Sequence, residues 1–156
     1  MEYKLDGLRI QAHVSKIQRS SDPMIQSEVK LFSRGLEDMT AMFPDVVEGL
    51  KKQIKHSCIV EGEMIAVSED GKTLAFNKTM NRKRKYDIDK MAEEIPMAIY
   101  LFDVLMVDGR NVMDKTNEER RRILEELVET NKTVRLMPRI VANNVSDIQK
   151  MFDKAL

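Results

Sequence analysis

The stretch MAIYLFDVLMV, residues 97–107, is the most apolar run of the chain and restricts its possible folds most strongly. It is well short of the roughly 20 apolar residues that a membrane-spanning helix needs. Its apolar residues follow one another almost without interruption, as they do in a strand covered on both faces. The run ends at Asp108-Gly109, a dipeptide typical of a tight turn. We therefore expect a central strand in a sheet, and no membrane partner.

Alternating apolar and polar residues predict further strands. Residues 8–14 alternate with period two, which gives a half-buried strand one apolar face. Residues 58–67 predict another strand, followed by the hairpin signal Glu69-Asp70-Gly71 and a return strand through Leu74 and Phe76. Shorter strands are predicted at residues 29–33 and 134–137.

Helix signals lie between these strands. Pro44 suits the first turn of a helix, and apolar residues at helical spacing follow it. Thr116 with Glu119 predicts a capping box, and Ser146 opens a second one. A further helix is expected over about residues 87–94.

Composition narrows the class of protein. The 156 residues suffice for one ordinary domain, and the 26 basic and 26 acidic residues cancel, so any nucleic-acid surface must be local. The single Cys58 lies in an apolar run and is interpreted as a reduced thiol, which favours an intracellular compartment. The charged N-terminus is unlike a signal peptide. We expect a soluble α+β domain of the cytoplasm or nucleoid, with mostly antiparallel sheets and flanking helices.

The stretch EYKLDGLR, residues 2–9, carries the strongest chemical signal. It places Lys4, Asp6, Gly7 and Arg9 close together, although an exposed Asp-Gly turn with solvated charges would explain the same residues. The stretch resembles the adenylation motif of ATP-dependent DNA ligases, especially of the archaeal and eukaryotic type. Arg9 stands where NAD-dependent ligases commonly carry a small residue, so the resemblance favours ATP.

Later segments resemble further motifs of this family, in the family's order. The resemblance covers nearly the whole chain and implies the ATP-grasp-like nucleotidyltransferase (adenylation) domain of a DNA ligase, an enzyme of replication, repair and recombination. The matching segments are FSRGLEDMT at 32–40, VEGEMIAV at 60–67, NRKRKYDI at 81–88, LFDVL at 101–105 and KTNEERR at 115–121.

The resemblance implies a reaction and a set of site residues. Lys4 would attack the α-phosphate of ATP with Mg²⁺ present, form lysyl-AMP, and pass AMP to the 5′-phosphate of nicked double-stranded DNA. Because a free lysine is protonated at neutral pH, activation is expected from Mg²⁺ and from cations such as Arg9 or Arg34, which Asp6 would oppose. The implied nucleotide-binding residues are Glu2, Asp6, Gly7, Arg9, Arg34, Glu63 and Phe102, and Glu63 is also the implied metal ligand.

Some of these residues have ordinary structural interpretations. Phe102 lies in an apolar run and could be a core residue, Arg34 could be a surface charge, and Asp103 could cap a turn. Glu63 is harder to explain in this way, because a carboxylate on an apolar strand is costly unless it is exposed or paired. His13 and His56 are expected to be structural, and their spacing with one cysteine suggests no zinc site.

Four consecutive cations are the best candidates for contact with DNA phosphates, and a solvated charged loop is the alternative. Such contacts would be indifferent to base sequence, which suits nick sealing. The four residues are Arg82, Lys83, Arg84 and Lys85.

The family's later E-G-x-M-x-K block and the K-x-K segment that follows it do not occur in residues 122–156, after the KTNEERR segment. We therefore expect residues 1–156 to be a partial adenylation domain, truncated at both ends, without the helical DNA-binding and OB-fold domains. Losing two lysines aimed at phosphate would cost several kcal/mol, so weak activity is expected. The alternatives are a non-catalytic remnant or interaction module, and an RNA ligase or other covalent nucleotidyltransferase. Exposed truncated sheet edges predict self-association.

Overall fold

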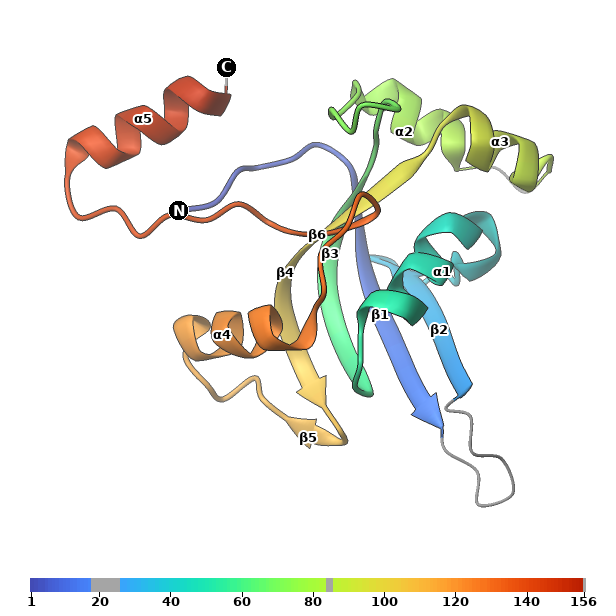
Figure 1. Cartoon of the computed structure of the whole chain (residues 1–156), viewed down its shortest axis with the longest axis horizontal. Helices are drawn as coiled ribbons and strands as arrows, with labels where there is room; N and C mark the ends of the chain where they lie inside the picture. The colour runs from blue at the N-terminus through green and yellow to red at the C-terminus, as the bar shows by residue number, and fades with distance from the viewer. Residues whose placement is uncertain (18–25, 84–85, 156) are drawn as a thin grey trace.

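A single six-stranded sheet forms the centre of the computed structural model, which describes residues 1–17, 26–83 and 86–155 (Figure 1). The strand order is β2-β1-β3-β4-β5, and β6 pairs with β4. Every pairing is antiparallel except that of β4 with β6. The expected α+β fold is therefore confirmed. The strands are β1 (Leu8–Ile17), β2 (Gln26–Ser33), β3 (Cys58–Ala66), β4 (Met97–Val107), β5 (Arg110–Asn111) and β6 (Val134–Leu136).

Helices flank the sheet and join its strands. Helices α1 and α4 pack on the sheet, whereas α5 extends away from it on the side of the N-terminus (Figure 1). Among the described residues, no helix is both long and apolar enough to cross a membrane. The helices are η1 (Thr40–Met42), α1 (Pro44–Gln53), α2 (Phe76–Arg82), α3 (Ile88–Glu94), α4 (Asn117–Leu127) and α5 (Val145–Ala155).

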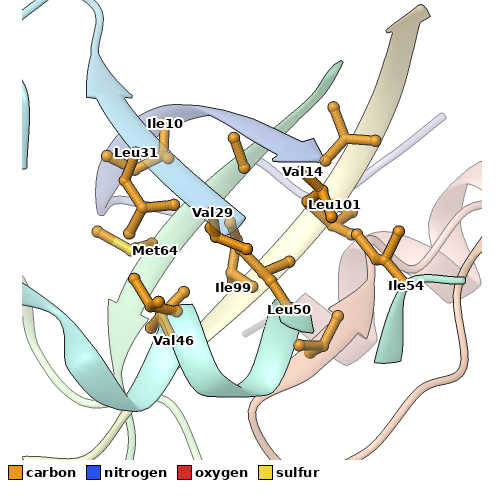
Figure 2. Packing of buried hydrophobic residues seen from close by; sticks show 14 of the residues in the cluster. Ile10, Val14, Val29, Leu31, Val46, Leu50, Ile54, Met64, Ile99 and Leu101 are labelled. Carbon is orange, nitrogen blue, oxygen red and sulfur yellow. The ribbon is translucent and has the colours of Figure 1, made fainter. Parts of the chain in front are cut away.

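The main core lies between one face of the sheet and α1. Ile10 and Leu31 come from neighbouring strands and meet Val46 and Leu50 of the helix, as Figure 2 shows. The alternation predicted for β1 is confirmed, because Ile10, Ala12 and Val14 are all buried. Each Å² of apolar surface that these side chains bury stabilises the fold by roughly 25 cal/mol, and this burial holds the helix on the sheet.

Strand β4 is buried on both faces, as its continuous apolar run predicts. Ile99 and Leu101 join the main core, while Ala98 and Tyr100 join a smaller cluster on the opposite face. Tyr3, Leu5 and Phe102 are only partly buried against this smaller cluster. The second face is therefore more open than the first.

The turn after β4 follows its sequence signal. Asp108 and Gly109 have φ angles of 47° and 77° and connect Val107 to its partner Arg110. A two-residue hairpin of the favoured kind needs positive φ at both positions, which Asp-Gly adopts easily.

Two local predictions were wrong. The predicted return stops at Leu74, whose N–H donates to the Ala66 carbonyl of β3, and a bridge joins Val67 to Thr73. Phe76 does not continue this strand but begins α2. Thr79 of α2 provides the acceptor that a return strand would otherwise supply, because its hydroxyl accepts a hydrogen bond from the Ala66 N–H at the end of β3.

The second error concerns the start of α5. The helix begins before Ser146, and the Asn144 side chain accepts from the Asp147 N–H, while the Asp147 carboxylate accepts from the Asn143 N–H. Thus a different residue caps this helix. The capping box of Thr116 and Glu119 is confirmed at α4.

Candidate functional site

A cavity of about 700 Å³ opens on the second face of the sheet. All eight residues expected to react with or bind the nucleotide line it, although they come from four separate segments. They are Glu2, Lys4, Asp6, Gly7, Arg9, Arg34, Glu63 and Phe102. Six further residues that the sequence did not single out complete the lining: Tyr3, Leu5, Leu8, Ser33, Gly35 and Met137.

Gly7 lets the segment carrying Lys4 lie directly on β3. A Cβ atom at this position would lie 2.2 Å from the carbonyl oxygen of Met64. The Gly7 N–H donates a hydrogen bond of 3.1 Å to Glu63 Oε1. The absence of a side chain therefore permits a close approach that places Lys4 and Glu63 in one pocket.

Burial raises the pKa of Glu63 above its ordinary value. The Gly7 N–H and the nearby charges of Lys4 and Arg9 act against this shift, whereas Asp6 adds to it. The carboxylate thus lies among the cations of the pocket while being partly withdrawn from water.

A β-bulge directs Phe102 into the pocket. Leu101 pairs with Gly62, whereas Asp103 pairs with Glu61, so Phe102 is the extra residue in β4. A bulge of this kind bends the strand and redirects a side chain. Phe102 is half-buried, and it is both a pocket wall and a packing residue of the smaller apolar cluster.

Glu61 holds Arg9 beside this ring. Its carboxylate accepts from the Arg9 guanidinium at 2.6 Å, and the guanidinium carbon lies 5.6 Å from the centroid of Phe102. Gln11 donates to the other carboxylate oxygen of Glu61 at 3.5 Å. Glu61 was not among the predicted site residues, yet its alternation with Glu63 on β3 places both acids on the same face, a signal that the sequence contains.

Asp103 does not cap a turn. Both of its carboxylate oxygens accept from Arg120, at 2.7 and 3.0 Å, and the Arg120 guanidinium also donates to the Lys115 carbonyl. The pair fixes the first turns of α4 to β4, beside the bulge that carries Phe102.

Arg82 cannot contact DNA as predicted, because it is fully buried. Its guanidinium donates to the Met42 carbonyl at 2.6 Å and to Asp45 at 3.0 Å, and it lies over the Phe43 ring. Asp45 also accepts from the Met97 N–H. Arg82 is thus a structural link between α2, α1 and the start of β4.

The rest of the basic run has a mixed outcome. Lys83 forms an ion pair of 2.9 Å with Glu37 and stays partly exposed. Arg84 and Lys85 lie outside the described residues, so their predicted contact with DNA stays a prediction.

The two histidines take part in local contacts away from the pocket. His13 shares a hydrogen bond of 2.8 Å with Gln11 and meets Phe32 edge-on, and burial lowers its pKa. His56 pairs with Asp108 at 2.9 Å and so lies at the β4 turn.

The pocket contains carboxylates that could contribute to a metal site, but few of them. Within residues 1–17, 26–83 and 86–155, no group of three or more His, Cys, Asp or Glu side chains could hold a metal ion. Asp6 and Glu63 both line the pocket, and Mg²⁺ is commonly held by one or two carboxylates together with phosphate oxygens.

The family profile described as "ATP dependent DNA ligase domain" matches residues 1–156. The chain belongs to this family. The resemblance read from the sequence motifs is therefore confirmed.

Archaeal DNA ligases are among the similar sequences. DNA ligase 2 of Thermofilum pendens is 41% identical over 99% of this chain and 24% of its own length. DNA ligase 1 of Methanosarcina barkeri is 39% identical over 99% of this chain and 28% of its own length. DNA ligase of Archaeoglobus fulgidus is 38% identical over 100% of this chain and 26% of its own length. This ligase domain thus spans about a quarter of these relatives.

Solved structures support the fold. A mycobacterial DNA ligase D complexed with ATP and MES superimposes with a TM-score of 0.66 at 20% identity, over 97% of this chain and 43% of that chain. The ligase domain of M. tuberculosis LigD gives 0.63 at 22% identity, over 97% and 44% of the two chains. These similarities concern the fold of the ligase domain.

Proposed function

We propose that this ligase domain binds ATP in the 700 Å³ pocket and that Lys4 accepts the adenylyl group. The proposal depends on one observation: Lys4, Glu63 and Phe102, from three distant parts of the chain, line the same cavity. Together they provide a nucleophile, a carboxylate and an aromatic surface on which a purine could stack.

The reaction consists of one displacement at phosphorus. The lone pair of Lys4 Nζ attacks the α-phosphorus of ATP, and a nitrogen–phosphorus bond forms. The bond from the α-phosphorus to the bridging oxygen breaks, and pyrophosphate leaves with the electron pair. The Lys4 ammonium loses one proton to solvent before the attack and a second after the nitrogen–phosphorus bond has formed. The products are lysyl-AMP, whose nitrogen keeps one hydrogen, and pyrophosphate.

The pocket contains cations that would assist attack by the Lys4 amine. A free lysine amine is protonated at neutral pH, and nearby cations favour its neutral form. Arg9 and Arg34 line the pocket and supply such charges. Glu2, Asp6 and Glu63 line the same pocket, and their carboxylates would act in the opposite direction.

Bound Mg²⁺ would supply positive charge to the phosphates, and Glu63 with Asp6 would help to hold it. Arg9 and Arg34 would contact ribose or phosphate, and Glu2 would lie near the adenine. In an enzyme of the length of the archaeal relatives, we propose that the adenylyl group passes on to a 5′-phosphate at a nick in double-stranded DNA.

Transfer of label from ATP tests the proposal directly. The wild type, Lys4→Ala and Lys72→Ala are incubated with α-labelled ATP and Mg²⁺, and protein-bound label is measured after denaturation. Lys72 is the control, because it is an exposed lysine paired with Asp70 in the β3 turn, outside the pocket. We expect label on the wild type and on Lys72→Ala, and none on Lys4→Ala.

Other outcomes identify the alternatives. Label on none of the three proteins would favour a non-catalytic remnant or interaction module. Equal label on Lys4→Ala and wild type would show that another group is modified and would overturn the assignment of Lys4.

A further inference from the structure

Arg121 of α4 lies where two separate walls of the pocket meet. Its side chain is only 12% exposed. An arginine is rarely buried to this extent unless its guanidinium has partners. The guanidinium Nη1 donates to the Met137 carbonyl at 2.9 Å and lies 3.8 Å from Glu2 Oε1. Its Nε donates to Glu125 at 2.6 Å. One side chain therefore connects α4 to both segments.

Both segments contribute to the pocket. Glu2 lies two positions before Lys4, and Glu2, Lys4 and Met137 are all lining residues. Glu2 forms a bridge with Arg139, and the Ile140 N–H donates to the Met1 carbonyl at 3.0 Å. The N-terminal segment thus depends on the segment after β6 for its place, and Arg121 lies beside this junction.

Met137 is held from its other side as well. Its N–H donates to the Leu101 carbonyl at 2.8 Å, and its side chain is buried in the smaller apolar cluster. Its carbonyl accepts from Arg121. Met137 is therefore fixed between β4 and α4, and the same Arg121 guanidinium lies 3.8 Å from Glu2.

We propose that Arg121 is a positioning residue that aligns the Glu2 and Met137 walls and thereby sets the affinity of the pocket for ATP. The proposal rests on the proposed function for its ligand. Arginine suits the role because its planar fork can serve several acceptors at once, whereas lysine offers one compact ammonium group. Arg121 lies outside the pocket lining and acts through Glu2 and Met137.

The kinetic test compares Arg121→Gln with Arg122→Gln in the labelling reaction. Arg122 is the matched control, because it is the next residue of the same helix, is 70% exposed and pairs with Glu118. We expect Arg121→Gln to raise the half-saturating ATP concentration about tenfold, with a change of less than about threefold in the rate at saturation. Arg122→Gln should leave both unchanged.

Two further variants separate positioning from loss of folding. Glu2→Gln removes one acceptor charge while Arg121 keeps Glu125 and Met137, so the fold should survive. If the two residues act together, the effects of Glu2→Gln and Arg121→Gln will not add in the double variant. Arg121→Lys keeps the charge and should recover only part of the affinity.

A measurement without ATP distinguishes this proposal from the proposed function. Hydrogen exchange of the Ile140 amide should accelerate at least tenfold in Arg121→Gln. Exchange of the Val47 amide of α1, which donates to the Phe43 carbonyl, should stay unchanged. If the wild-type protein takes up no label, the proposed function is rejected, and the effect of Arg121 on ATP affinity is rejected with it. Hydrogen exchange of the Ile140 amide would still show whether Arg121 aligns the two walls. The role of Arg121 would be overturned if Arg121→Gln had the same Ile140 exchange rate and the same half-saturating ATP concentration as Arg122→Gln. Additive effects of Glu2→Gln and Arg121→Gln in the double variant would overturn it as well.

Discussion

The backbone N–H of Gly7, in the segment that carries Lys4, donates to the carboxylate of Glu63, which lies 56 residues further along the sequence. Two properties make this contact possible. Gly7 has no side chain to strike β3, and Glu63 points to the open face of the sheet.

Gly7→Ala should displace the Lys4 segment. Its Cβ would lie 2.2 Å from the Met64 carbonyl oxygen, which belongs to backbone and cannot rotate away. We expect loss of at least 90% of the Lys4 labelling and a decrease of about 1–3 kcal/mol in the free energy of unfolding, as measured by urea titration. Gly35→Ala is the stability control, because its Cβ would lie at least 3.9 Å from every atom outside Gly35 and the two residues next to it in the chain. Full labelling of Gly7→Ala would contradict this account of the loop.

Glu63→Gln should change how stability depends on pH. Burial raises the pKa of the folded-state carboxyl, so the folded protein holds this proton more tightly than the unfolded chain does. The free energy of unfolding should therefore fall as pH rises from about 4.5 through the folded pKa. Glutamine keeps an acceptor for Gly7 and does not ionise, so its stability relative to wild type should increase over that pH range. Thermal midpoints measured from pH 4 to pH 8 test this, and a difference that shrinks with rising pH would contradict it.

Arg82 and Lys83 should differ strongly in their effects on stability although they are adjacent. Arg82→Ala would leave Asp45 without its guanidinium partner in a part-buried position, so we expect a loss of about 3–5 kcal/mol. Lys83→Ala removes an exposed pair with Glu37 and should cost less than about 1 kcal/mol. Urea unfolding of both variants measures the difference. Equal values would show that Arg82 does not link the helices as described.

Alanine substitutions test which residues cap the N-termini of α4 and α5. Thr116→Ala should lower the free energy of unfolding by about 1 kcal/mol, since the Thr116 hydroxyl accepts from the Glu119 N–H. Asn144→Ala should weaken α5 for the same reason, whereas Ser146→Ala, inside the helix, should change little. Helix-specific hydrogen exchange provides the measurement. A larger effect at Ser146 than at Asn144 would restore the capping box that the sequence predicted.

Gel filtration tests the self-association predicted from exposed sheet edges. Strand β2 is an edge of the sheet, and its Phe32 is bridged to Asp38. The prediction is a dimer or larger species, because an open strand edge can pair with a second chain. A strictly monomeric profile at high protein concentration would count against it.

Local sequence patterns were sufficient for the elements whose causes are local. Period-two alternation identified β1, the continuous apolar run identified β4, and the Thr116 capping box identified the start of α4. The motifs that resemble those of DNA ligases also identified eight residues that the structure brings to one pocket. Each of these signals is contained in a short stretch of residues.

Only the tertiary structure decided which charges are buried and where the pocket walls meet. Arg82 is indistinguishable from its cationic neighbours in sequence, yet Met42 and Asp45 surround it once α1 and α2 pack together. Likewise, Arg121 gains its role only when α4 brings it beside Glu2 and Met137. The physical reason is that the cost of burying a charge depends on partners distant in sequence, whereas strand and helix periodicity depend on near neighbours.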